Sequence, residues 1–124
     1  AWGGKSLFKD FRPPSAEGET GEYYKKMLAE VEEALTGVDE EFPSLKGRKP
    51  EWAGFIWMQG WNDMFDKAAL VEYEQNLIYL VNDLRKEFKS PKLPVVIGEL
   101  GNGGPKAGAN MLAIRVAQKA AAQA

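Results

Sequence analysis

The stretch WAGFIWMQGWND, residues 52–63, decides how the chain is organised. Its first half is apolar without alternation and is bounded by Pro50 and Gly60, which predicts a buried parallel strand at about residues 52–58. A short buried helix is the alternative, but the aromatic content and the length favour a strand. The polar residues from Gln59 to Asp63 then follow the carboxyl end of that strand, where open α/β sheets bind their ligands.

Helical and strand patterns alternate on both sides of this stretch. Residues 67–89 repeat apolar side chains with a helical period, and residues 93–98, LPVVIG, predict a second strand buried on both faces. Upstream, Thr20 is the expected N-cap of a helix that ends at Gly37, and Ala1-Trp2 resembles the end of a strand. Downstream, a helix is expected from about residue 107 to the end. Its apolar stripe is Met111, Ile114, Ala117 and Ala121.

This alternation predicts an α/β fold, a parallel sheet with helices on both faces. We expect residues 1–124 to form one unit. Two complete strands and a stub cannot cover three amphipathic helices, however. The sequence therefore indicates the central part of a larger domain, or a chain that completes its sheet with a second copy of itself. The missing initiator Met likewise suggests processing or excision from a longer chain.

Composition excludes several classes of function. The chain has 16 Lys and Arg against 18 Asp and Glu, a net charge of −2, so no nucleic-acid partner is expected. No apolar run approaches about 18 residues, so no membrane span is expected, and no signal peptide is visible. With neither His nor Cys, the chain offers no His or thiolate metal ligands and no complete Ser-His-Asp or Cys-His site. No metal site is expected.

No cofactor is expected either. The glycine-rich residues 101–104 precede a predicted helix and so could cradle an anion, but a plain β–α loop is the alternative. They lack both the Gly-Lys-Ser/Thr ending of a phosphate-binding loop and the spacing of a dinucleotide-binding loop.

The polar residues after the first strand could serve ester chemistry. Asn62 could donate an amide N–H to a developing oxyanion, and Gly60 would let the backbone approach a ligand closely. The alternative is a local Asx turn, with Asn62 and Asp63 bonded to their own backbone and Asp63 capping the next helix. Gly3 and Gly4 could offer a backbone N–H in the same way, or could simply form a turn.

These residues carry a family resemblance. The pattern Gly60-x-Asn62-Asp63 resembles the third conserved block of SGNH hydrolases, and residues 56–63 resemble the W-x-Q-G-x-x-D segment of their sialate O-acetylesterase and carbohydrate acetylesterase branch. Residues 1–7, AWGGKSL, resemble the glycine block of that branch. Residues 73–98 resemble its helix-then-strand continuation.

The resemblance implies a flavodoxin-like three-layer α/β/α fold and a Ser-His ester hydrolase acting on acylated carbohydrates or similar small esters. It makes Asn62 and an amide of Gly3 or Gly4 the oxyanion hole. It also places Gln59, Gly60, Trp61 and Asp63 at the substrate, where Trp61, like Trp2, could stack on a sugar ring. A secreted or extracytoplasmic location would fit the same resemblance.

The chain also departs from the family pattern. Many members have Glu where this chain has Trp61, and the family's nucleophile Ser and Asp-x-x-His blocks would lie upstream of Ala1 and downstream of Ala124. None of the four serines has a nucleophile's context: Ser6, Ser15, Ser44 and Ser90. We therefore expect the chain alone to be inactive. A non-catalytic carbohydrate-binding module and a self-assembling structural fragment remain the alternatives.

Overall fold

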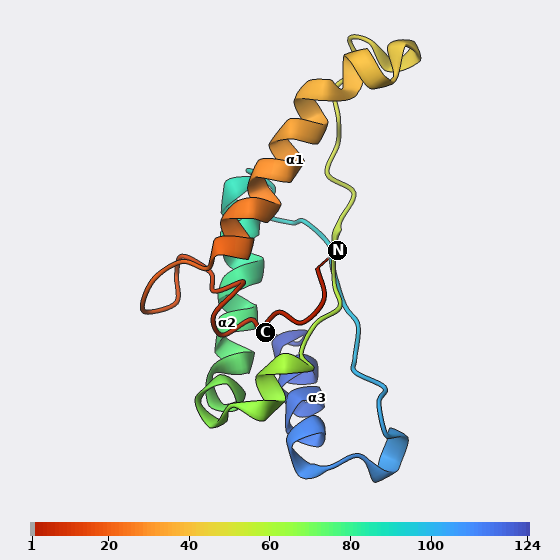
Figure 1. Cartoon of the computed structure of the whole chain (residues 1–124). Coiled ribbons are helices and arrows are strands. Elements are labelled where there is room, and N and C mark those ends of the chain that lie inside the picture. The colour runs from red at the N-terminus through yellow and green to blue at the C-terminus, as the bar shows by residue number, and fades with distance from the viewer. Residues whose placement is uncertain (1) are drawn as a thin grey trace.

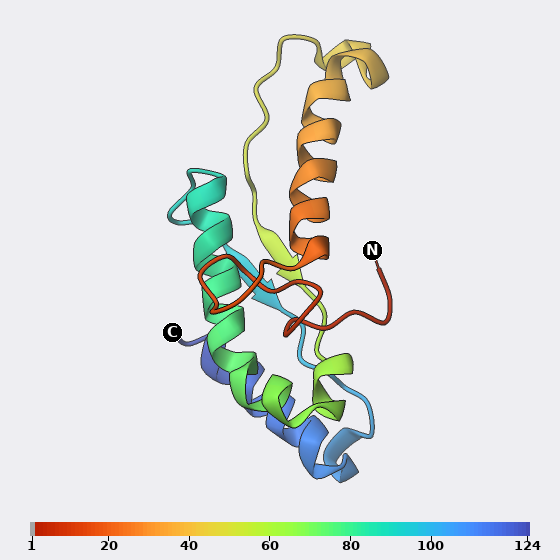
Figure 2. The ribbon, with the colours of Figure 1, turned by 60° about the vertical axis from the view of Figure 1, so that its left-hand side comes forward.

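The computed structural model describes residues 2–124, which form three long helices (Figure 1) and a small two-stranded parallel sheet (Figure 2). Strand β1 and strand β2 are joined through helix α2, so the sheet is built from one strand–helix–strand unit. The elements, in chain order, are α1 (Glu22–Glu41), η1 (Pro43–Leu45), β1 (Phe55–Trp57), η2 (Asn62–Phe65), α2 (Lys67–Glu87), β2 (Val95–Ile97), η3 (Gly104–Lys106) and α3 (Ala109–Ala121), where η marks a 3₁₀ helix.

The two strands pair in parallel, with Ile56 opposite Val96 at the centre of the register. Each strand is shorter than the sequence predicts. Pro94 lacks an N–H, but its carbonyl oxygen still accepts a bond from the N–H of Phe55 at 2.9 Å. The predicted α/β class is confirmed, in the form of a partial α/β fold.

Helices cover only one face of this sheet within the described residues. The side chain of Trp57 is 5% exposed and its indole N–H donates to the hydroxyl of Tyr73 on α2. On the opposite face, Ile56 is 68% exposed and Val96 is 60% exposed. The prediction that both strands are buried on both faces is therefore wrong for this chain, because nothing in residues 2–124 packs on the second face. Figure 2 shows the two strands side by side, with α2 beside them.

The core lies where α2 and α3 pack against each other and against the inner face of the sheet. The helical repeat predicted for residues 67–89 is confirmed, since its central positions are buried: Tyr73, Leu77, Leu80 and Leu84. The stripe predicted for the last helix is also buried at Met111, Ile114 and Ala117. The side chain of Asp66 accepts a bond from the N–H of Ala69 at 2.9 Å and caps the start of α2.

Helix α1 differs most from its prediction. It continues to Glu41 rather than ending at Gly37, and Gly21, not Thr20, is its N-cap. Gly21 is required there because a Cβ would lie 2.2 Å from the carbonyl oxygen of Asp10. Tyr24 is the only residue of α1 that is fully buried, and the outer half of the helix projects from the body together with the chain that returns from it (Figures 1 and 2).

The amino-terminal segment forms no strand in the part of the chain that the structure describes. The Ala1 half of the predicted strand stub lies outside the described residues, and Trp2 packs its ring against Phe11 and Tyr23 at centroid distances of 6.0 and 5.5 Å. No described helix is long and apolar enough to span a bilayer.

Candidate functional site

Asp63 ties the amino-terminal segment to the loop after β1. Its side chain is 0% exposed, and its two carboxylate oxygens accept the backbone N–H groups of Leu7 and Phe8, each at 2.9 Å. Asp63 caps no helix, since Asp66 holds that position for α2. The local capping role considered for Asp63 is therefore wrong. The carboxylate instead fixes a segment more than fifty positions away.

Gln59 makes a second link between the same two segments. Its side-chain Nε2 donates to the carbonyl oxygen of Lys5 at 2.8 Å and to the Asp63 carboxylate at 2.6 Å. We call the contacts of Asp63 and Gln59 with residues 5–8 the carboxylate clamp. A direct contact of Gln59 or Asp63 with a substrate stays a prediction, and the side-chain amide N–H groups of Gln59 are already engaged in the clamp.

Burial raises the pKa of the Asp63 carboxyl above its ordinary value of 3.8, while the hydrogen bonds from Gln59, Leu7 and Phe8 act in the opposite direction. Desolvation is the larger effect because the group has no exposed surface. The donated hydrogen bonds favour the ionised form, so the clamp limits the cost of a buried carboxylate.

Two buried polar side chains form hydrogen bonds with the backbone of the loop after β1. The carbonyl oxygen of Gln59 accepts the hydroxyl of Tyr73 at 2.6 Å and the Nε2 of Gln118 at 3.0 Å. Burial raises the pKa of Tyr73 to about 12, so its hydroxyl keeps its proton for this bond. Gln118 was not among the residues predicted for the site. The available signal was a polar residue on the apolar face of the last helix, four positions after Ile114.

Gly60 is required by packing. Its φ angle is +151°, and a Cβ would lie 2.9 Å from Ile114 and 3.1 Å from the Tyr73 hydroxyl. Residues other than glycine rarely adopt this backbone conformation. In this structure Gly60 brings the loop close to the core, and its approach to a ligand stays a prediction.

Asn62 begins η2 and is partly exposed. Its side-chain amide makes no hydrogen bond with any residue from 2 to 124, in contrast to the side chains of Gln59 and Asp63. The Asx turn considered for Asn62 is therefore not formed. The amide is free to donate to a bound group.

Gly3 and Gly4 are both exposed, and a Cβ on either would meet no atom within 4 Å. The positive φ expected in this turn occurs at Gly4, where it is +69°. Neither glycine N–H donates a hydrogen bond to another described residue. The clamp begins at the next residue, Lys5, so it fixes the segment from which these amides project.

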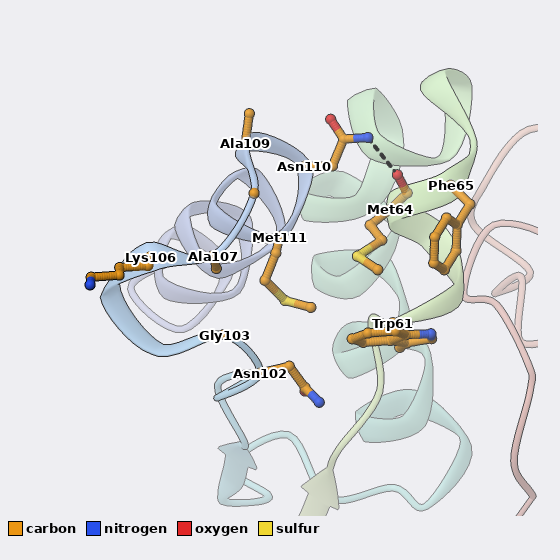
Figure 3. A pocket seen from close by; sticks show the side chains of 11 residues that line it. Trp61, Met64, Phe65, Asn102, Gly103, Lys106, Ala107, Ala109, Asn110 and Met111 are labelled. Carbon is orange, nitrogen blue, oxygen red and sulfur yellow. Dashed lines mark hydrogen bonds between the residues drawn. The ribbon is translucent and has the colours of Figure 1, made fainter.

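A pocket of about 510 Å³ opens beside this loop, between η2 and the chain that follows β2 (Figure 3). Both of its walls follow the carboxyl ends of the two strands. Among the predicted site residues only Trp61 lines it, and the indole is 46% exposed. Its lining is mainly apolar: Trp61, Met64, Phe65, Asn102, Gly103, Lys106, Ala107, Gly108, Ala109, Asn110 and Met111.

The model of one protein family, described as carbohydrate esterase, sialic acid-specific acetylesterase, matches residues 1–124. The chain belongs to this family. Comparison with curated proteins and with solved structures found no match. The resemblance carried by residues 1–7 and 56–63 is thereby confirmed at the level of the acetylesterase family.

In this acetylesterase chain the glycine-rich residues 101–104 form a turn that uses several of its own N–H groups. The N–H of Gly104 donates to the carbonyl oxygen of Gly101 at 3.1 Å, and the N–H groups of Lys106 and Ala107 are also used within the turn. The plain β–α loop is therefore the better description. Within residues 2–124 no group of three or more acidic side chains is placed to hold a metal ion.

Proposed function

We propose that this chain supplies the oxyanion-binding side of a Ser-His carbohydrate acetylesterase. The observation that supports the proposal most is the carboxylate clamp. Asp63 and Gln59 fix the segment of Gly3 and Gly4 against the loop that carries Asn62. The side chains of Gln59 and Asp63 are engaged in this contact, whereas the Asn62 amide and the two glycine N–H groups make no hydrogen bond among the described residues.

In the proposed reaction a serine oxygen attacks the carbonyl carbon of the acetyl ester, and negative charge develops on the carbonyl oxygen. The Nδ2–H of Asn62 and a backbone N–H of Gly3 or Gly4 would donate hydrogen bonds to that oxygen. One such donor stabilises the transition state by about 3 kcal/mol in acyl-transfer enzymes. Asp63 acts as a positioning residue, because it holds the glycine segment without reaching the ester itself.

The serine and its base would come from outside this chain. The sequence contains no His, so no imidazole is present to activate a hydroxyl. The proposed substrate is an acetylated carbohydrate, in keeping with the family description.

A first experiment measures hydrolysis of an aryl acetate by the isolated chain. We expect the rate of buffer alone, because the chain lacks a nucleophile and base pair. A faster rate that Asn62→Ala abolishes would show that the chain is itself an esterase and would contradict the proposal.

A second experiment places the chain in a longer protein that carries the serine and histidine blocks of the same family. There, Asn62→Ala should lower kcat for an aryl acetate by about 100- to 1000-fold. Its matched control is Asn82→Ala, at an exposed position on α2. Equal rates for the two variants would refute the role of Asn62.

A further inference from the structure

We propose that the pocket between η2 and the chain after β2 is the subsite for the sugar ring of the ester, with Trp61 as its stacking platform. This inference rests on the proposed function, since it assigns a place to the carbohydrate whose acetyl group would lie at Asn62. Trp61 and Asn62 are adjacent in the chain. Both stand at the start of η2, so the proposed stacking platform and the proposed oxyanion donor belong to the same short element.

The chemistry of the lining fits a sugar face. Trp61 is 46% exposed, and its ring meets Phe65 edge-on at a centroid distance of 5.9 Å. In Figure 3 Trp61 lies on one side of the hollow, with Met64 and Met111 near it. Aromatic and thioether groups attract the apolar C–H face of a pyranose, which buries apolar area without desolvating its hydroxyls.

Asn102 supplies the polar group that a sugar hydroxyl needs. Asn102 lies on the chain after β2, on the wall of the pocket that faces Trp61 in Figure 3, and its side chain makes no hydrogen bond with the residues that the structure describes. A carboxamide both donates and accepts, as a hydroxyl does. One oriented amide beside an aromatic face is the usual composition of a small-ligand site.

The pocket walls are held in place by side chains outside the hollow. Arg115 on α3 donates to the carbonyl oxygens of Asn102 and Gly104, each at 2.7 Å, and also to that of Leu100. Across the pocket, the Nδ2 of Asn110 donates to the carbonyl oxygen of Met64 at 2.8 Å. These bonds fix the position of Asn102 relative to η2 before any ligand binds, which lowers the entropic cost of binding.

The charge distribution indicates which part of the ligand enters. Lys106 is the single charged residue among those that line the pocket, and Figure 3 shows its side chain directed away from Trp61. The lining thus contains no buried cation that could pair with a carboxylate or phosphate group of a ligand. The pocket accordingly suits the uncharged face of a sugar and its hydroxyls.

The test is equilibrium binding of O-acetylated N-acetylneuraminic acid and its deacetylated form, with affinities measured by isothermal titration calorimetry and the binding site located by the indole N–H signals of the ¹⁵N-labelled chain. The sequence has four Trp, so each signal reports one site. We expect a saturable shift of the Trp61 signal. Trp61→Ala should weaken binding by about tenfold or more, and Trp61→Phe, which keeps a ring, should weaken it less.

The matched control is Trp52→Ala. Trp52 is also partly exposed, at 39%, but it stacks on Phe88 at 4.1 Å and does not line the pocket. Binding by this variant should equal that of the unmodified chain. The absence of saturable binding, or unchanged affinity in Trp61→Ala with its remaining signals well dispersed, would overturn the subsite.

The result of the sugar-binding test does not depend on the proposed oxyanion role of Asn62. Hydrolysis of an aryl acetate involves no sugar, so a failure of Asn62→Ala to slow it would refute the proposed function alone. Loss of the sugar subsite, conversely, would leave the aryl acetate result unchanged.

Discussion

At the residue scale, the carboxylate of Asp63 has the most consequential position in the molecule. It joins segments that are 56 positions apart and leaves the neighbouring Asn62 amide free. A buried carboxylate with three N–H donors is stable only while all of its partners are present, because an unpaired buried charge is costly. The same residue therefore determines both the local stability and the placement of the glycine segment.

Replacement of Asp63 by Asn tests this role. The amide places an NH₂ group where a carboxylate oxygen accepts a donor, so Asp63→Asn should lower the free energy of unfolding by about 1–3 kcal/mol near neutral pH. A carboxyl whose pKa is raised by folding binds its proton more tightly in the folded chain. The contribution of Asp63 to stability should thus increase as the pH falls from neutral toward 3.8, and the difference between the two proteins should widen.

Urea unfolding of both proteins across that pH range measures the effect. Asp39→Asn, an exposed substitution near the outer end of α1, is the control and should change neither the stability nor its pH dependence. A difference between Asp63→Asn and the unmodified chain that narrows on acidification would contradict the raised pKa.

At the element scale, the helix starts show how tertiary contacts select a cap. Helix α2 begins at an Asp66 side chain that accepts a hydrogen bond, as local chemistry favours. Helix α1 begins at Gly21, which has no capping side chain, because residues 10–12 pass too close for a Cβ. The N–H of Gly21 donates instead to the carbonyl oxygen of Arg12 at 2.9 Å.

The two helix starts predict different changes in stability for two substitutions. Asp66→Ala removes a cap and should destabilise the chain by about 1 kcal/mol. Thr20→Ala should change the free energy of unfolding by less than about 0.5 kcal/mol. The Thr20 side chain makes no hydrogen bond with any other described residue. Thermal or urea unfolding compares them directly. A larger loss for Thr20→Ala would show that the cap of α1 is misassigned.

At the scale of the whole molecule, the sheet has one packed face and one open face. Leu77 and Leu80 on α2 are 0% exposed beneath the packed face, whereas Ile56 and Val96 are mostly exposed on the other. The hydrophobic contribution to stability comes from the area removed from water, so the packed face should dominate it.

Paired truncations measure this asymmetry. Leu77→Ala should cost about 2–5 kcal/mol, because it leaves a cavity between α2 and the core. Ile56→Ala should cost less than about 1 kcal/mol, since its side chain is already 68% exposed. Urea unfolding at low protein concentration gives both values. Similar losses for the two variants would mean that the outer face of the sheet is covered in solution.

Local sequence patterns predicted the three helices and the parallel pairing of the two strands. The apolar runs around Ile56 and Val96 and the helical repeat through Leu77 depend on neighbouring residues, so their strand and helix assignments follow from periodicity. The glycine block and the Gly60-x-Asn62-Asp63 pattern likewise indicated the acetylesterase family, which the whole-chain match confirms.

Only the tertiary structure decided which side chains are engaged and which are free. Asp63 and Asn62 are neighbours in sequence, and both suited a local turn. Asp63 accepts hydrogen bonds from the distant Leu7 and Phe8 as well as from Gln59, however, while the Asn62 side chain has no partner among the described residues. The exposure of Ile56 and the role of Gln118 could not be predicted from sequence for the same reason. Hydrogen bonding and burial depend on segments distant in the chain, and periodicity describes only neighbours along it.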